Sequence, residues 1–258
     1  MNLLINVGLT YEVFHKTDAL IQIEVAQTPE QHLSADTINA TPRLALPIPG
    51  ESDIGVRRWL ETDTSISCEY TARVGIARKT VELESLSAVA SIDLDGEATR
   101  YLLPSRYCDV DLFNAFAQSE FSGLEGGSRV AAIARWTEDS LAYVPGTSDS
   151  RTTASDTFVA REGICRDYAH VFIALVRASG IPARFVSCYA PDVSPPDFHA
   201  VAEVWLDGAW WMVDPSGMSQ PHETAVIGVG RDAADVAFLT TFGPARFVKQ
   251  FVRINRCA

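Results

Sequence analysis

The sequence predicts an α+β protein, in which an antiparallel β-sandwich-like domain of residues 1–104 precedes a domain of residues 105–258 that runs from helices into an antiparallel sheet. Apolar and polar residues alternate over 19–25, which is the period of a half-buried strand. A helical apolar pattern covers 164–179, and the pair Asp207-Gly208 joins two apolar runs in the manner of a tight hairpin turn. A run of helices followed by strands with short connections is typical of α+β folds.

Strands are predicted throughout the first hundred residues. Short apolar runs occupy 44–48, 65–76 and 80–86, and prolines, glycines or an Asp-Gly pair separate them, as in a small antiparallel sandwich. His15 and His32 lie in this part, and a lone histidine among strands and turns is expected to be structural. We expect no catalytic constellation in this domain.

Helices are predicted after residue 104. Ser128 can cap one helix, and Ser155 can cap a second, shorter one that follows a polar surface loop. A stronger helix over 164–179 ends at Gly180 and Pro182, the order that helix termination favours. Three strand-like segments then follow, at 183–190, 199–206 and 209–214.

The composition is that of an ordinary globular chain. Of its 258 residues, 47% are hydrophobic and 21% are charged, which excludes a largely disordered chain, a collagen-like chain and a disulfide-dense mini-protein. With 21 Lys and Arg against 33 Asp and Glu, the net charge is −12. Because this charge repels phosphates and anionic lipids, we expect neither a nucleic acid nor a membrane as partner.

The cysteines indicate the compartment. There are five, an odd and scattered set without a CxxC pair, which favours reduced thiols inside a cell over a disulfide framework. The first residues lack the basic start and long apolar run of a signal peptide, and no stretch of 18 uncharged apolar residues occurs. We therefore expect a cytoplasmic location.

Cys165 is the first candidate for chemistry. It follows Gly163-Ile164 at the start of the strong helix, where unpaired backbone N–H groups and the helix dipole favour a thiolate. Such a thiolate can act as a nucleophile. The alternative is a buried, unreactive thiol, which is the commoner fate of a free cysteine.

The predicted hairpin brings a histidine and an aspartate together. Counting outward from its two-residue turn pairs Trp205 with Trp210, Val201 with Asp214 and His199 with Ser216. His199 and Asp214 are then diagonal neighbours on one face, within reach of an imidazole–carboxylate hydrogen bond. A register slip of one residue would put them on opposite faces.

Cys165, His199 and Asp214 together form a complete nucleophilic set. A carboxylate bonded to one imidazole nitrogen fixes the tautomer, and the other nitrogen can take a proton from a thiol. Taken singly, His199 can be a strand-start histidine and Asp214 an acid that ends a strand before Pro215. Their occurrence on one face, with a cysteine at a helix start, favours the catalytic interpretation.

Two segments carry a resemblance to a known family. They are GICRDYAHVFIALVRASGIPARFVSCYAP and DFHAVAEVWLDGAWWMVDPSG. Their motifs, Gly-x-Cys-x-Asp, Gly-Ile-Pro-Ala-Arg, Asp-Phe-His-Ala and Trp-x-x-x-Asp-Pro, occur in the order found in the transglutaminase-like superfamily. The sequence closely resembles this superfamily over residues 100–258, in particular bacterial cysteine protease-like members that carry a β-rich N-terminal domain.

The resemblance implies a papain-like, transglutaminase-like core of helices packed on an antiparallel sheet. It implies that Cys165 is the nucleophile, His199 the general base and acid, and Asp214 the residue that orients His199. The sequence departs from the family at Cys188, where relatives commonly have Gly, and at Val201, where Trp is common. Neither departure removes a catalytic group, but both can reshape the cleft.

Other residues have simpler explanations. Asp167 in the first helical turn compensates the helix dipole, and Arg166 accompanies it in the family motif. His170 is on another helical face from Cys165 and is expected to be structural, and Cys188 is expected to pack. Three tryptophans are expected to pack across strands first and to border a substrate second; they are Trp205, Trp210 and Trp211.

We therefore predict acyl transfer on an amide or peptide bond of a protein or peptide, through a thioester on Cys165. Hydrolysis would make the protein a cysteine protease or amidase, and transfer to an amine a protein-glutamine transglutaminase. The Cys165 N–H is one expected oxyanion donor, and Tyr143 and Tyr101 are candidates for the second. No calcium loop or zinc spacing occurs, so we expect no cofactor or metal. The alternative is a non-catalytic binding scaffold with the same fold.

Overall fold

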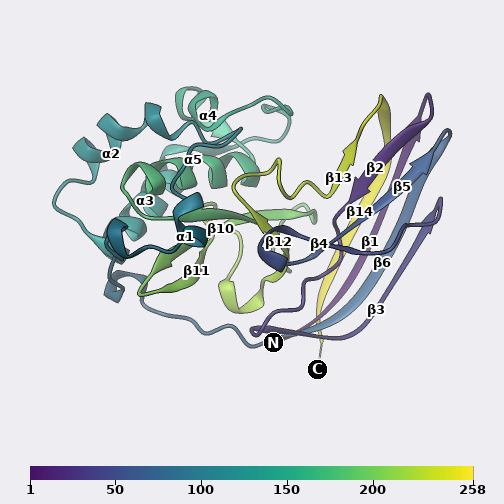
Figure 1. Ribbon diagram of the computed structural model, residues 1–258, viewed down its shortest axis with the longest axis horizontal. Helices are drawn as coiled ribbons and strands as arrows, with labels where there is room; N and C mark the ends of the chain where they lie inside the picture. Colours follow the sequence, from purple (N-terminus) through teal and green to yellow (C-terminus); the bar gives the residue numbers. More distant parts are fainter. Residues whose placement is uncertain (258) are drawn as a thin grey trace.

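The computed structural model describes residues 1–257, and it confirms the predicted α+β class. A part made of strands lies beside a part in which helices cover a third sheet (Figure 1). The first and last strands pair with each other, Asn2 opposite Cys257, so both chain ends lie in the strand part. No helix within these residues is both long and apolar enough to cross a membrane.

Two four-stranded antiparallel sheets build the strand part, and their apolar faces share one hydrophobic core. In the strand of residues Ser65–Ile76 every second side chain is buried, from Ile66 to Ile76, as its alternating sequence predicts. The first sheet has the order β14-β1-β6-β3: β14 (Ala245–Cys257), β1 (Asn2–Val13), β6 (Ser65–Ile76) and β3 (Gln31–Thr41). The second has the order β13-β2-β5-β4: β13 (Leu239–Thr241), β2 (Thr17–Ile21), β5 (Val56–Thr62) and β4 (Ile48–Pro49).

The last strands of the chain return to the strand part. β13 pairs with β2, and β14 pairs with β1 along almost its whole length. A division into successive domains at residue 104 stays a prediction, but the strand part includes residues 239–257 as well as the first half. Most β14 side chains are exposed, so its pattern carries little sign of this pairing.

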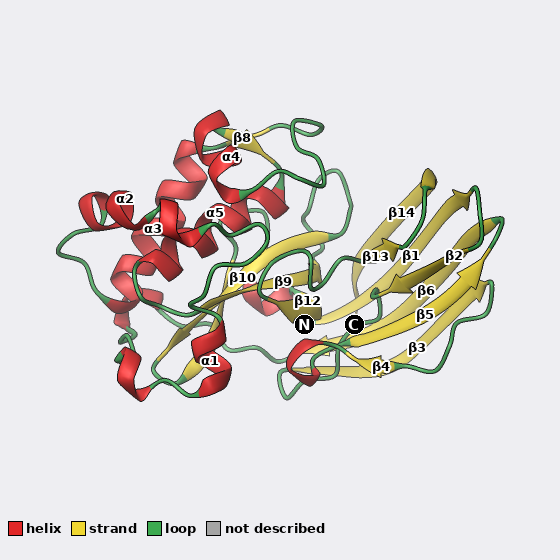
Figure 2. Ribbon diagram, turned by 45° about the horizontal axis from the view of Figure 1, so that its top comes forward, coloured by secondary structure: helices red, strands yellow, loops and turns green. Residues whose placement is uncertain are grey.

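The helical part surrounds α5 (Cys165–Ala178), whose residues are buried on every side except at Arg166 and Ala178. This helix packs on a four-stranded antiparallel sheet in the order β11-β10-β9-β12, which lies between the helices and the strand part (Figure 2). The strands are β9 (Ala183–Tyr189), β10 (His199–Leu206), β11 (Ala209–Val213) and β12 (Ala225–Gly230). The other helices and the small parallel pair are α1 (Gly96–Arg100), α2 (Asn114–Glu120), α3 (Gly126–Ser140), α4 (Ala154–Ala160), β7 (Ala142–Tyr143) and β8 (Glu162–Gly163).

The predicted strand at 80–86 is wrong, because this stretch belongs to the linker between the two parts. Its apolar residues Leu83 and Leu86 pack against the helical core, and only a short 3-10 turn, Leu83–Ser85, forms there. The backbone of α3 meets this linker closely, since a Cβ on Gly127 would lie 1.6 Å from the carbonyl oxygen of Leu83. α3 therefore begins at Gly126, two residues before the predicted cap Ser128.

Two other predicted boundaries move. The run at 44–48 contributes only its last residue to a strand, the pair Ile48–Pro49. Thr153, not Ser155, caps α4, because its hydroxyl accepts the N–H of Asp156 while the Asp156 carboxylate accepts the N–H of Thr153.

Candidate active site

Cys165 is the first residue of α5, and the Gly-x-Cys-x-Asp motif explains its placement. The Asp167 carboxylate turns back to accept the N–H of Ile164 at 2.9 Å, which fixes the start of the helix. A Cβ on Gly163 would lie 2.8 Å from Cβ of Asp167, so glycine leaves room for this turn. Asp167 is fully buried and also pairs with Arg166 at 2.8 Å. Its role in the helix start agrees with the structural explanation of the sequence.

The His199–Asp214 pair forms as the hairpin count predicts. In the pairing of β10 with β11, Trp205 lies opposite Trp210 and Ala202 lies opposite Val213. The same register, extended by one residue, puts Asp214 on the face of the sheet that carries His199. Nε2 of His199 lies 2.8 Å from Oδ2 of Asp214. Both side chains are buried, with 0% and 3% of their surfaces exposed.

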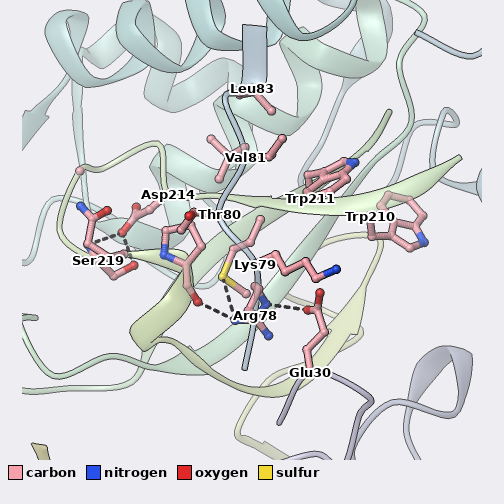
Figure 3. A pocket seen from close by; sticks show the side chains of 15 residues that line it. Glu30, Arg78, Lys79, Thr80, Val81, Leu83, Trp210, Trp211, Asp214 and Ser219 are labelled. Carbon is pink, nitrogen blue, oxygen red and sulfur yellow. Dashed lines mark hydrogen bonds and ion pairs between the residues drawn. The ribbon is translucent and has the colours of Figure 1, made fainter. Parts of the chain in front are cut away.

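Asp214 receives five hydrogen bonds, and Ser219 is the partner that the sequence did not reveal. Besides His199, the N–H and hydroxyl of Ser216 donate to Oδ1 at 2.9 and 2.6 Å, and the N–H and hydroxyl of Ser219 donate to Oδ2 at 2.8 and 2.6 Å. Figure 3 shows Ser219 beside the carboxylate. Gly217 adopts φ +68°, which lets the chain turn around the acid. A serine beyond an Asp-Pro turn has no distinctive pattern.

The linker from the strand part supports the segment behind Asp214. Arg78 is buried and donates to the carbonyl oxygens of Pro221 and Thr224, both at 2.8 Å, and it pairs with Glu30 at 2.8 Å (Figure 3). These contacts supply a buried donor to the carbonyl oxygens of the segment that follows Asp214. The strand part thereby helps to hold the loop that donates to Asp214.

The charges of the pair follow from these bonds. Burial alone would raise the pKa of Asp214, but hydrogen bonds from His199, Ser216 and Ser219 lower it below its ordinary value. Burial alone would lower the pKa of His199, but its bond to Asp214 and the nearby Cys165 raise it to about 10. The geometry therefore favours an imidazolium held by a carboxylate at neutral pH.

The second ring nitrogen of His199 is the one left for chemistry. Nδ1 is buried, and within residues 1–257 it has no hydrogen-bond partner. Cys165 is close enough to raise the pKa of His199 through its polar contact and its charge, although the contact of its sulfur with the ring falls short of a well-aligned hydrogen bond. Catalytic hydrogen bonds are often loose before substrate binds. The arrangement leaves Nδ1 available to exchange a proton beside the thiol.

Tyr143 also lies beside Cys165. β7 pairs with β8 so that Tyr143 is opposite Gly163, two residues before the cysteine. Burial raises the pKa of Tyr143, and the negative charge of Cys165 raises it further. A hydrogen bond from the Cys165 N–H lowers the pKa, but by less. Tyr101, the other predicted oxyanion donor, is elsewhere: its hydroxyl lies 3.0 Å from that of Ser52 and its ring packs on Trp210.

Cys165 and His199, both buried, border a cleft of about 580 Å³ between the helical and strand parts. Leu239 and Thr240 of β13 and Gln250 of β14 line it from the strand part. Its apolar wall includes Phe198 and Phe238, whose rings stack 4.5 Å apart. The cleft can hold a segment of substrate in contact with both parts.

The other predicted residues have structural places. His170 is buried, burial lowers its pKa to about 3, and its Nε2 accepts the N–H of Ala233. Cys188 is buried opposite His199 and donates to the carbonyl oxygen of that residue at 3.6 Å. The tryptophans pack across strands or line a separate groove of about 340 Å³, as Figure 3 shows for Trp210 and Trp211.

Metal-ligand side chains do not gather in the part of the chain that the structure describes: no three His, Cys, Asp or Glu residues are placed to hold an ion. The expectation that the protein uses no metal or cofactor stays a prediction.

Comparisons with known proteins agree with this fold. Residues 117–215 match the model of the transglutaminase-like superfamily, and this range contains Cys165, His199 and Asp214. The crystal structure of a "Putative Cysteine Protease from Cytophaga hutchinsonii" is 34% identical, with a TM-score of 0.93 over 99% of this chain and 90% of that one.

Mycobacterial relatives cover less. An uncharacterized protein of Mycobacterium leprae is 29% identical over 68% of this chain and 64% of its own length. Uncharacterized proteins of Mycobacterium bovis and Mycobacterium tuberculosis are 34% identical over 36% of this chain and 35% of their own length. The chain therefore spans less than two thirds of the length of these relatives.

Proposed function

The chain belongs to the transglutaminase-like superfamily, and from this premise we propose that it cleaves amide or peptide bonds through Cys165, His199 and Asp214, with water as the acyl acceptor. The observation that carries the proposal is the orientation of His199. Asp214 holds Nε2 at 2.8 Å, while the buried Nδ1 is left without a hydrogen-bond partner among residues 1–257 and Cys165 lies close by. A cysteine nucleophile needs a base that is oriented by a third group and lies beside the thiol, and this orientation of His199 supports that role.

The reaction would proceed in two halves. The Cys165 thiolate attacks the carbonyl carbon, a C–S bond forms, and the carbonyl oxygen takes the negative charge. When the C–N bond breaks, the imidazolium at Nδ1 gives its proton to the leaving amine, and a thioester remains. Water then attacks the thioester, Nδ1 takes its proton, and the C–S bond breaks to restore the thiolate.

Two donors would stabilise the oxyanion. The Cys165 N–H is at the first turn of α5, where backbone N–H groups have no partner within the helix. Tyr143 is our candidate for the second donor, because its hydroxyl lies beside Cys165 and its backbone is fixed by the pairing of β7 with β8. Asp214 would keep the ring of His199 oriented and stabilise its charge.

The experiment that tests this function distinguishes the acyl acceptors. The wild type and Cys165→Ala are incubated with a mixture of unfolded proteins in H₂¹⁸O, with and without a biotin-linked primary amine, and the products are analysed by mass spectrometry. Hydrolysis places ¹⁸O in new carboxyl groups, whether at cleaved peptide bonds or at deamidated glutamines.

We expect ¹⁸O-labelled carboxyl groups with the wild type and none with Cys165→Ala. Incorporation of the biotin-amine without ¹⁸O would show that an amine, and not water, is the acyl acceptor. The protein would then be a transglutaminase. No Cys165-dependent product of either kind would contradict the proposal and support the scaffold alternative.

A further inference from the structure

The charges that line the Cys165 cleft differ in sign from the protein as a whole. The chain carries a net charge of −12, yet the cleft is lined by two arginines, Arg106 and Arg166, and one acid, Asp197. Asp197 accepts hydrogen bonds from the N–H of Phe198 at 2.7 Å and from Gln250. Burial raises its pKa, so its charge is the more easily lost.

Arg166 is already neutralised. Its Nε and Nη2 donate to the buried carboxylate of Asp167 at 3.1 and 2.8 Å, and Nη2 also donates to the carbonyl oxygen of Asp149 at 2.7 Å. These bonds fix the start of α5. Two N–H donors on Nη1 remain, but Asp167 already balances the charge of Arg166, so a substrate carboxylate gains less there than at an unpaired arginine.

Arg106 is the charge that remains available. It is exposed, and within residues 1–257 its guanidinium takes part in no ion pair or hydrogen bond. It lies over the ring of Tyr107, 4.9 Å from the centroid. A cation above an aromatic face keeps its N–H donors free at the edge, where they can meet a carboxylate.

The platform under Arg106 is rigid. The Tyr107 ring stacks on the buried ring of His170 at 5.0 Å, and its hydroxyl donates to the carbonyl oxygen of Ser150 at 2.8 Å. Its backbone N–H donates to the buried carboxylate of Asp232 at 2.9 Å. Tyr107 is thus held by its ring, its hydroxyl and its backbone, so the aromatic face under Arg106 has a fixed place beside the cleft.

We propose that Arg106 forms a subsite for a carboxylate of the substrate, so that the preferred substrate of Cys165 is an acidic peptide segment. The inference rests on the proposed function of Cys165 and adds its substrate class. A guanidinium binds a carboxylate through two parallel N–H donors, and the free donors of Arg106 fit this chemistry.

The test uses two alkylating reagents that differ in one group. Iodoacetate and iodoacetamide react alike: the thiolate attacks the CH₂ carbon, a C–S bond forms, and iodide leaves. Only iodoacetate carries a carboxylate. The ratio of their rates at Cys165, measured at pH 7 and low salt by peptide mass spectrometry, therefore reports a carboxylate subsite without a known substrate.

We expect the iodoacetate-to-iodoacetamide ratio to fall about three- to tenfold in Arg106→Gln, the range of one exposed charge-assisted hydrogen bond. Salt at 0.5 M should remove most of the difference between wild type and variant. Arg253→Gln is the matched control, because Arg253 is an exposed arginine over Phe251 at 5.4 Å, outside the cleft. It removes the same charge and should leave the ratio unchanged.

The possible failures are distinguishable. Fast iodoacetamide labelling of Cys165 with an equal ratio in wild type and Arg106→Gln overturns the subsite and leaves the proposed function intact. An equal fall in Arg253→Gln also overturns it, because the effect would then be one of net charge. If Cys165 reacts with iodoacetamide no faster than Cys257, the proposed function fails and the subsite with it.

Discussion

His199→Ala is expected to lower kcat for amide cleavage by about 10³- to 10⁴-fold, the size of effect that a general acid–base group contributes together with activation of its nucleophile. Without the imidazole, the site lacks the group that gives a proton to the leaving amine and takes one from water. The measurement is steady-state turnover on a peptide found in the ¹⁸O experiment.

The control for this variant is His32→Ala, which removes an exposed histidine of β3 and should leave turnover unchanged. Because catalytic groups that act as a unit are not additive, the double variant with Asp214→Asn should be no slower than His199→Ala alone. A loss of less than about tenfold in His199→Ala would mean that another group is the base.

Asp214→Asn is expected to lower kcat by about 10³- to 10⁴-fold and to destabilise the fold by about 3–5 kcal/mol. The carboxylate accepts five hydrogen bonds, from His199, Ser216 and Ser219. An amide has one acceptor oxygen and no charge, so it leaves buried donors unsatisfied and cannot stabilise the imidazolium.

The destabilisation should depend on pH. Because folding lowers the pKa of Asp214, the ionised carboxylate stabilises the fold at pH values above about 3.9, the pKa in the unfolded chain. This stabilisation is lost as the pH falls through the pKa of the folded protein. Because folding raises the pKa of His199, the imidazolium stabilises the fold at pH values below about 6.5, the pKa in the unfolded chain. This stabilisation is lost as the pH rises through about 10. The difference between wild type and Asp214→Asn should therefore be largest between about pH 4 and 6.5.

Urea unfolding at pH 5.5, 7.5 and 9 measures this difference. We expect it to shrink with rising pH by at most about 1.4 kcal/mol per unit. Asp192→Asn is the control, since Asp192 pairs with Arg256 at an exposed position. A difference that is equal at all three values would contradict a buried charged pair.

The sequence predicted the placement of the candidate site residues where local rules determine it. The two-residue turn at Asp207-Gly208 sets the register of β10 with β11, and this register alone brings His199 and Asp214 to one face. Cys165 was placed at a helix start by Gly163 and by the helix that follows, and the structure agrees. Turns and helix ends are short-range features, so one sequence is sufficient to find them.

The rest depends on contacts between distant segments. Ser219 completes the shell of Asp214 through a loop that Arg78 holds from the linker, and no local pattern announces either residue. The apolar pattern of the linker sequence resembles that of a strand. In the structure its leucines Leu83 and Leu86 pack against the helical core and not against a neighbouring strand. Tyr143 and Tyr101 are equal candidates in the sequence, and only the pairing of β7 with β8 places Tyr143 beside Cys165.

The strand part also contributes more than the sequence predicted. β13 and β14 lie at the end of the chain, yet they pair with the first strands and line the cleft through Leu239, Thr240 and Gln250. Pairing between the two ends of the chain, from Leu239 with Ile21 to Cys257 with Asn2, leaves no short-range signature. The strand part therefore forms one wall of the cleft that holds Cys165 and His199.

Labelling by iodoacetamide from pH 5 to 9 measures whether Cys165 is an activated nucleophile. Cys257, which is partly exposed, is an internal reference in the same molecule. An ordinary thiol is about 10⁻³ ionised at pH 5.5, and its labelling rises about tenfold per pH unit until it is ionised. We expect Cys165 to label about 10²-fold faster than Cys257 at pH 5.5, because its thiol lies at the start of α5 beside His199, and we expect His199→Ala to remove this advantage. If Cys165 labels as slowly as Cys257 at pH 5.5, and if both rates rise in parallel with pH, Cys165 is not an activated nucleophile.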